Sequence, residues 1–180
     1  MTLIRFQVSQ DGSNHEKINE KRGDNQMIDI NTYRLEKDAN RHPFLVAEEK
    51  FNYHSAAITC PEEAVEITNK LFRLDKLAEE EVILFSLDAA CKLLAIFRLS
   101  HGGVNHSLCG TREVFQRALL TGAVSIIVIH NHPSGDPHPS DTDIILLKKL
   151  EEAGKLMGVS LSDFIIIGDT FYSYKTEGLN

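Results

Sequence analysis

The sequence predicts an α/β (α+β) sandwich in which a mixed β-sheet is flanked by helices. One indication is an apolar, largely β-branched run over residues 123–130, which is typical of a central strand buried on both faces. A second is two hairpin patterns, one over 81–99 and one over 164–174. The third is a set of helical patterns that lie between these strands in the sequence.

Length and composition indicate one soluble domain together with an additional segment of chain. The chain has 180 residues, of which 42% are hydrophobic and 25% charged. No apolar run approaches the roughly 20 residues that span a bilayer, and the N-terminus turns polar too early for a secretory signal. We therefore expect a cytoplasmic protein without a membrane segment.

Charge and cysteine content exclude two further classes. The formal net charge is −7, so the composition offers no global electrostatic case for nucleic-acid binding. The three cysteines (Cys60, Cys91 and Cys109) are odd in number and lack CxxC spacing. This predicts free thiols rather than a disulfide framework or a zinc knuckle.

The chain divides into an N-terminal part, 1–55, and a domain, 56–180. Residues 8–27 are polar and carry almost no large apolar side chains, which predicts a flexible arm. Residues 28–55 hold scattered apolar positions without a clean period. We expect this segment to wrap onto the domain or onto a partner, and its pattern does not distinguish the two.

Regular structure is expected to begin near Cys60. Pro61 followed by two glutamates is a favourable helix start, and apolar spacing continues one buried face to about Leu77. Strands are predicted over 81–87 and 92–99, joined by a turn at 88–91.

The second half alternates helices and strands. Thr111 is the expected N-cap of a helix that ends at Gly122, and the buried strand 123–130 follows. Ser140 is the expected N-cap of a long amphipathic helix that Gly158 ends. A hairpin over 164–174 completes the predicted order.

A group of metal-ligand residue types follows the buried strand. His130 and His132 are two residues apart, so their imidazoles lie on the same side of an extended chain. Asp143 lies at the start of the next helix and could return to meet them. Two histidines and an aspartate supply three corners of a tetrahedral zinc site, and an open fourth corner distinguishes a catalytic zinc from a structural one.

Simpler interpretations compete for several of these residues. Ser140 and Asp143 have the spacing of a capping box, which explains both without a metal but leaves the histidines unexplained. His138, between two prolines, is expected to be an exposed loop residue, and Asp136 a turn residue. The tripeptide His-Asn-His also suggests a nuclease, but that class disperses the three residues through a ββα-metal unit.

The string from His130 to Pro137, with Pro139, Ser140 and Asp143, resembles the signature of RadC-type JAB/MPN domain proteins. The spacing His-x-His, seven residues, Ser, two residues, Asp is that of the JAMM metalloprotease motif. The position between the histidines is Asn131, which resembles RadC-like members in residue type, whereas the wider family usually has Ser or Thr there. The resemblance covers roughly residues 56–176 and implies a fold related to the cytidine-deaminase type, in a short stand-alone form that lacks a helix-hairpin-helix segment.

The resemblance implies a zinc-dependent hydrolase that cleaves a peptide or isopeptide bond. His130, His132 and Asp143 would hold one Zn²⁺ per chain, and the Ser140 hydroxyl would donate to the developing oxyanion. The implied partner is a protein or peptide substrate, with nucleic acid and membrane disfavoured. The resemblance leaves open whether the protein forms a homo-oligomer.

The same resemblance implies a glutamate as general base. Glu80 is our choice among Glu79, Glu80 and Glu81, because RadC-like chains carry Glu eight positions before the Leu-Asp that ends the strand, here Leu87-Asp88. A solvated acidic cluster is the competing interpretation, and Glu113 is the second candidate. The alternative function is a non-catalytic JAB scaffold or a DNA-repair-associated binding module.

Overall fold

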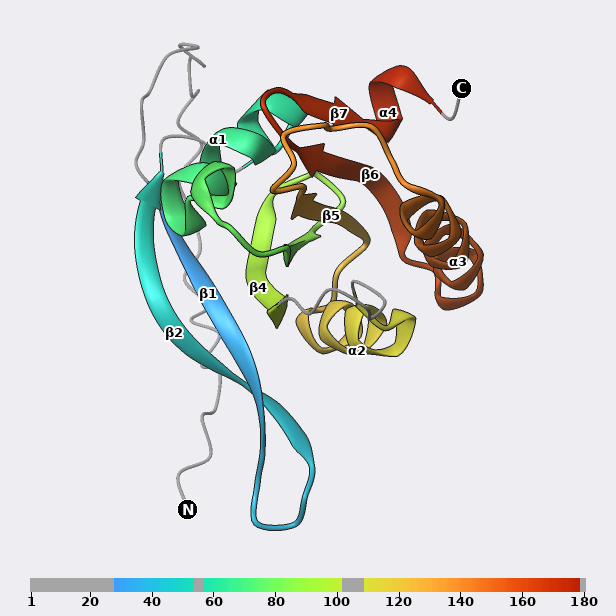
Figure 1. Ribbon diagram of the computed structural model, residues 1–180. Coiled ribbons are helices and arrows are strands. Elements are labelled where there is room, and N and C mark those ends of the chain that lie inside the picture. Colours follow the sequence, from blue (N-terminus) through green and yellow to red (C-terminus); the bar gives the residue numbers. More distant parts are fainter. Residues whose placement is uncertain (1–27, 54–56, 102–108, 179–180) are drawn as a thin grey trace, which may run out of the picture.

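The computed structural model describes residues 28–53, 57–101 and 109–178, so the predicted arm over 8–27 lies outside the described residues. Seven strands form one sheet in the order β2-β1-β4-β3-β5-β6-β7 (Figure 1). The pairings β1–β4 and β5–β6 are parallel and the other four are antiparallel. The predicted mixed sheet flanked by helices is confirmed.

The strands at the centre of the sheet are apolar on both faces. These are β3 (Glu81–Leu87) and β5 (Ser125–Asn131), in which every residue is buried. They pair antiparallel with Val82 opposite His130. On either side lie β4 (Leu93–His101) and β6 (Ser160–Ile167), and β7 (Phe171–Ser173) closes one edge.

Helices cover the two faces of the sheet unequally. Helix α1 (Pro61–Phe72) and the short helix η1 (Leu74–Lys76) pack on one face, over a core that includes Phe85 and Ile129. Helices α2 (Thr111–Thr121) and α3 (Asp141–Met157) pack on the other (Figure 1). Helix α4 (Tyr174–Glu177) follows β7 at the C-terminal end. The domain is therefore a three-layer arrangement with two apolar cores.

Helix boundaries follow the sequence signals, with two corrections. The first helix, expected to continue to about Leu77, ends at Phe72, because Arg73 has a left-handed backbone with φ 55° and only the short helix η1 follows. Helix α3 begins after Ser140, and both α2 and α3 end at a left-handed glycine, Gly122 with φ 69° and Gly158 with φ 68°. The predicted N-cap Thr111 is wrong, because Gly110 is the N-cap and Thr111 is already helical. Glycine serves there without a side-chain hydrogen bond, since an N-cap needs an extended backbone first.

A long hairpin precedes the rest of the domain. Strands β1 (Ile28–Lys37) and β2 (Pro43–Tyr53) form an antiparallel ribbon that extends beyond the body of the molecule (Figure 1). The ribbon joins the sheet where Thr32 pairs with Ile96 of β4. The sequence leaves open whether this segment wraps onto the domain or onto a partner; in the structure residues 28–53 form a hairpin that extends the domain's own sheet.

No described helix is both long enough and apolar enough to cross a membrane. All three cysteines are free, as predicted, with Cys91 exposed, Cys60 half-buried and Cys109 buried.

Burial predicts a large stability difference between two truncations. Phe85 is fully buried in β3, whereas the Leu156 side chain on α3 is 88% exposed. We expect Phe85→Ala to lower the free energy of unfolding by about 3–5 kcal/mol, because a cavity remains in the core. Leu156→Ala, the control, should change it by less than about 0.5 kcal/mol. Urea unfolding followed by circular dichroism measures both, and equal effects would contradict this account of the core.

The thiols are predicted to differ in reactivity. Burial, with a smaller contribution from Glu113, raises the pKa of Cys109 from 9.0 to about 12. Three pKa units lower the thiolate fraction about a thousandfold, and the thiolate is the reactive form. Dithionitrobenzoate at pH 8 should therefore modify exposed Cys91 rapidly and Cys109 only on unfolding. Cys91→Ser should remove the fast phase, and a fast phase that survives this change would contradict the prediction.

Candidate metal centre

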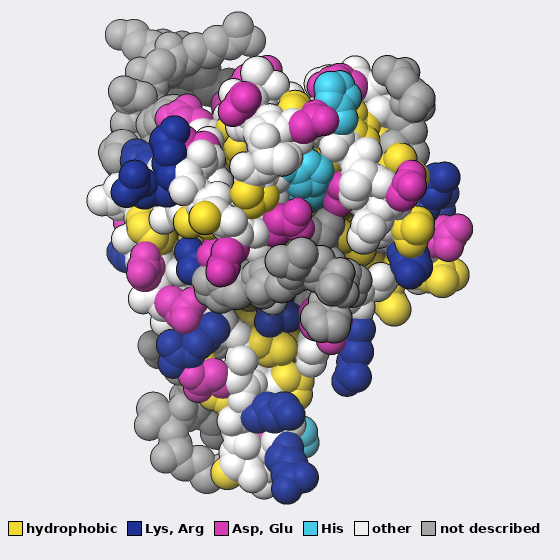
Figure 2. All heavy atoms as spheres, in the orientation of Figure 1, with side chains coloured by type: hydrophobic (Ala, Val, Ile, Leu, Met, Phe, Trp, Pro, Cys, Tyr) yellow, Lys and Arg dark blue, Asp and Glu magenta, His cyan; other side chains and the backbone are white. Residues whose placement is uncertain are grey.

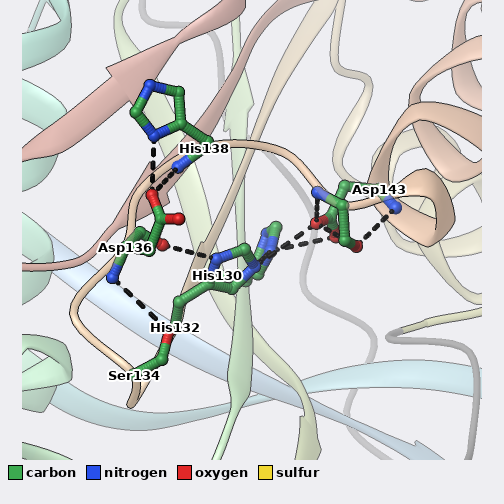
Figure 3. Close-up of polar contacts among 7 residues, drawn as sticks. His130, His132, Ser134, Asp136, His138 and Asp143 are labelled. Carbon is green, nitrogen blue, oxygen red and sulfur yellow. Dashed lines mark hydrogen bonds and ion pairs between the residues drawn. The ribbon is translucent and has the colours of Figure 1, made fainter.

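The two histidines and the aspartate meet at one end of the sheet. His130 is the penultimate residue of β5, His132 follows one residue after the strand, and Asp143 lies in the first turn of α3. His130 and Asp143 are fully buried, and the His132 side chain is 13% exposed. Figure 3 shows both imidazoles directed toward the Asp143 carboxylate. The group therefore has a buried base and one side that reaches solvent.

The three separations between ligand atoms match a small coordination site. The His130 and His132 Nε2 atoms are 3.1 Å apart. Asp143 Oδ1 is 3.1 Å from His130 Nε2, and Oδ2 is 3.3 Å from His132 Nε2. A tetrahedral zinc with bonds of 2.0–2.1 Å has edges of about 3.3 Å between ligand atoms. These residues form a group that could hold a metal ion.

Asp143 serves its helix as well as the group. Its Oδ2 accepts hydrogen bonds from the Ser140 backbone N at 2.7 Å and from the Ser140 hydroxyl at 2.6 Å. The Asp143 backbone N donates to Ser140 Oγ at 3.3 Å, which completes a capping box. The two interpretations weighed from the sequence are thus compatible in one geometry, since the cap orients the carboxylate toward the imidazoles.

The surroundings keep Asp143 ionised. Burial opposes its ionisation, but hydrogen bonds from His130, His132 and Ser140 outweigh burial and hold the pKa of this carboxyl below its ordinary value. The hydrogen bond that His132 donates to Asp143 is also the largest cause that raises the pKa of His132. A buried carboxylate between two imidazoles is an arrangement that a divalent cation would neutralise.

The loop after the strand sets the orientation of His132. Its Nδ1 lies 2.8 Å from the Asp136 carbonyl oxygen, which can only accept, so Nδ1 donates there and the ring is oriented with Nε2 toward Asp143. The loop passes Gly168 so closely that a Cβ there would lie 2.2 Å from the Gly135 carbonyl oxygen. Gly135 itself has φ 87°, which favours glycine.

The sequence did not assign this role to Asp136, because a backbone carbonyl leaves no signal in residue type. The Asp136 carboxylate instead pairs with His138, whose Nδ1 is 2.6 Å away and whose side chain is 82% exposed (Figure 3). His138 lies outside the group that could hold a metal, in agreement with its expected place in an exposed loop.

The three adjacent glutamates face different surroundings. Glu81 is buried, and its Oε2 lies 3.2 Å from Arg98 Nε, whereas Glu79 and Glu80 are exposed. Because Val82 pairs with His130, continuing the register by two residues places Glu80 opposite His132, on the face that carries the imidazoles. The charge of Glu80 also contributes, after Asp143, to the raised pKa of His132. Glu81 belongs to the opposite face by the same alternation, whereas Glu79 lies in a bend before the strand.

Glu113 occupies a different position. It lies in the first turn of α2, and its carboxylate folds back over Gly110, where a Cβ would lie 1.9 Å from Glu113 Oε2. This is the arrangement of an acid that complements a helix N-terminus.

The fold and the site define a JAB-type domain with a candidate His-His-Asp metal centre at the end of its central sheet. The model of the RadC-like JAB domain matches residues 58–179, and the chain belongs to this family. The hairpin of β1 and β2 precedes the matched part.

Curated relatives agree with this assignment. The chain is 44% identical over 110 residues to a UPF0758 protein of Clostridium perfringens, covering 61% of this chain and 48% of that protein. It is 46% identical over 107 residues to a UPF0758 protein of Methanosarcina acetivorans, covering 59% and 47% respectively. It is 40% identical over 129 residues to UPF0758 protein CA_C1241 of Clostridium acetobutylicum, covering 71% and 56%. The chain thus spans about half the length of the curated relatives it matches.

Metal binding is predicted to depend on the imidazoles. We expect about one zinc per chain by mass spectrometric metal analysis, and His132→Ala should weaken the affinity by at least about 100-fold. Zinc at about 100 times its Kd should stabilise the wild type by about 2.7 kcal/mol, since it binds only the folded state.

The matched control is His138→Ala, which removes an imidazole from the same loop but outside the group. It should bind zinc as the wild type does. Equal loss in the two variants would show that the loop, rather than the ligand set, determines binding.

Proposed function

We propose that this chain is a zinc-dependent hydrolase of the JAMM metallopeptidase type that acts on a peptide or isopeptide carbonyl. The observation that carries the proposal is the convergence of three ligand residues on a site with one solvent-reaching side, with the two imidazole Nε2 atoms and the two carboxylate oxygens 3.1–3.3 Å from their nearest partners. His130, His132 and Asp143 would hold the ion. Imidazole and carboxylate in tetrahedral spacing favour zinc among the common divalent ions.

When bound, the metal would supply Lewis-acid chemistry, which polarises a carbonyl and acidifies water. The protein's own contribution begins with proton transfer. Glu80 is the proposed general base and acid, because the β3–β5 register, continued to residue 80, directs it to the face of the imidazoles, and it is exposed enough to exchange a proton with a substrate or water. Glu81 is less suited, since its carboxylate is buried beside Arg98.

Ser140 contacts Asp143 in the structure, and we propose a second role for it in stabilising an oxyanion. Its hydroxyl donates to Asp143 and so helps to hold the ligand in place. A hydroxyl has a single hydrogen, so donation to a developing oxyanion requires that hydrogen to leave Asp143 Oδ2. We propose this exchange of partners as the step that links the cap to oxyanion stabilisation.

Acidic and histidine side chains share part of the molecular surface. Figure 2 shows histidine side chains reaching the surface among acidic ones on the upper part of this face. Negative side chains at a surface raise the local concentration of cations. A peptide or isopeptide segment, rather than a bulky polyanion, is the substrate class that we propose.

The proposal predicts a specific effect of Glu80→Gln. This change removes the proton acceptor but keeps its size, so we expect zinc content to stay at the wild-type level and hydrolysis to fall by about 10²–10⁴-fold. Hydrolysis can be followed by mass spectrometry of a complex peptide mixture, including isopeptide-linked peptides, incubated with the zinc-loaded protein.

Glu79→Gln is the matched control, because it removes an adjacent exposed carboxylate that lies in the bend before β3. It should leave hydrolysis unchanged. Wild-type protein that binds zinc but cleaves nothing, together with retained cellular function in His130→Ala, would favour the non-catalytic scaffold instead.

A further inference from the structure

Asn131, between the two histidines, makes a pair of hydrogen bonds to a distant segment. It is 1% exposed, and its position in β5 directs its side chain to the face opposite His130 and His132. Its Oδ1 accepts from the Glu81 backbone N at 2.8 Å, and its Nδ2 donates to the Glu79 backbone carbonyl at 3.1 Å. One side-chain amide thus contacts the backbone on both sides of residue 80.

The two bonds replace sheet pairing at the start of β3. The ladder between β3 and β5 begins with Val82 and His130, so the backbone before Val82 is held to β5 by the Asn131 side chain. Both bonds have donor–acceptor distances in the normal range. Without them, the Glu81 N–H and the Glu79 carbonyl would lose their partners near a buried part of the sheet, which is costly.

This arrangement determines the direction of Glu80. The two bonds fix the backbone on both sides of residue 80, and continuing the register of Val82 with His130 from that fixed backbone directs Glu80 to the face where the imidazoles lie. Glu79 and Glu80 are both exposed, so packing alone does not restrain this segment.

We propose that Asn131 is a positioning residue that holds Glu80 in register with the metal ligands. The end of β5 then supplies the ligands His130 and His132 on one face of the sheet. From the other face, Asn131 orients Glu80, the proposed general base. The inference rests on the proposed function of Glu80 and His132.

The test compares Asn131→Ala with the wild type and with Asn69→Ala as the control. Asn69 is half-buried and likewise accepts a backbone N–H, that of Asp75 at 3.1 Å, but on α1. Amide hydrogen exchange, followed by NMR, reports the bond to Glu81 directly. Paramagnetic broadening of the Glu80 side-chain carboxyl carbon in the Co²⁺-loaded protein reports whether Glu80 stays near the metal. That carbon is assigned by its loss in Glu80→Gln.

In Asn131→Ala we expect Co²⁺ to bind, the Glu81 amide to exchange at least about tenfold faster, and the broadening of Glu80 to weaken. The Ile83 amide, deeper in β3, should keep its wild-type exchange rate. Asn69→Ala should change none of these quantities. If Asn131→Ala does not fold, Asn131→Asp provides the same comparison, because it keeps the acceptor for Glu81 but cannot donate to Glu79. It should retain the Glu81 protection while weakening the broadening of Glu80.

The outcomes separate the two proposals. Unchanged exchange and broadening in Asn131→Ala, with Co²⁺ bound, would overturn the role of Asn131 and leave the proposed hydrolase intact. Wild-type protein that binds no Co²⁺ would overturn the proposed function together with the positioning role that rests on it. Faster exchange of all β3 amides alike would show that Asn131 supports the fold in general, which also contradicts a positioning role.

Discussion

The antiparallel pairing of β3 with β5 is the constraint on which the rest of the molecule depends. The two strands are the most completely buried in the sheet, and their apolar side chains supply both cores. Their register, with Val82 opposite His130, also decides which side chains share a face with the imidazoles. A single set of backbone hydrogen bonds therefore links the stability of the domain to the composition of its site.

The second organising feature is the position of Asp143 at the start of α3. Its carboxylate has two functions, because it accepts hydrogen bonds from the backbone N–H and hydroxyl of the N-cap residue Ser140 and faces two imidazoles at once. The helix start is thereby tied to the end of β5 without a direct backbone pairing between the two elements. The loop between them is held in turn by the contact of Gly135 with Gly168.

Much of this could be predicted from local sequence, for identifiable reasons. The helix that begins after Ser140 and the buried strand that ends near His130 carry strong cap and burial signals. The hairpin of β1 and β2 was not predicted as strands, because most of its side chains are at least partly exposed and its apolar residues do not alternate cleanly. The choice among three adjacent glutamates is not a local property at all. It depends on the pairing of residues 50 positions apart, which the bond from Glu81 N to Asn131 displays.

Burial of β3 on both faces has a consequence for fold specificity. In a half-exposed strand, a slip of one residue would bring polar side chains into the core and is strongly disfavoured. In β3 both faces are apolar from Val82 to Phe85, so hydrophobic burial discriminates poorly between neighbouring alignments. The polar contacts at the start of the strand, from Glu81 to Arg98 and to Asn131, then carry much of the free-energy gap between the native alignment and a slipped one. Polar groups here select one alignment among several of similar hydrophobic energy, and a slipped chain would present a different glutamate to the histidines.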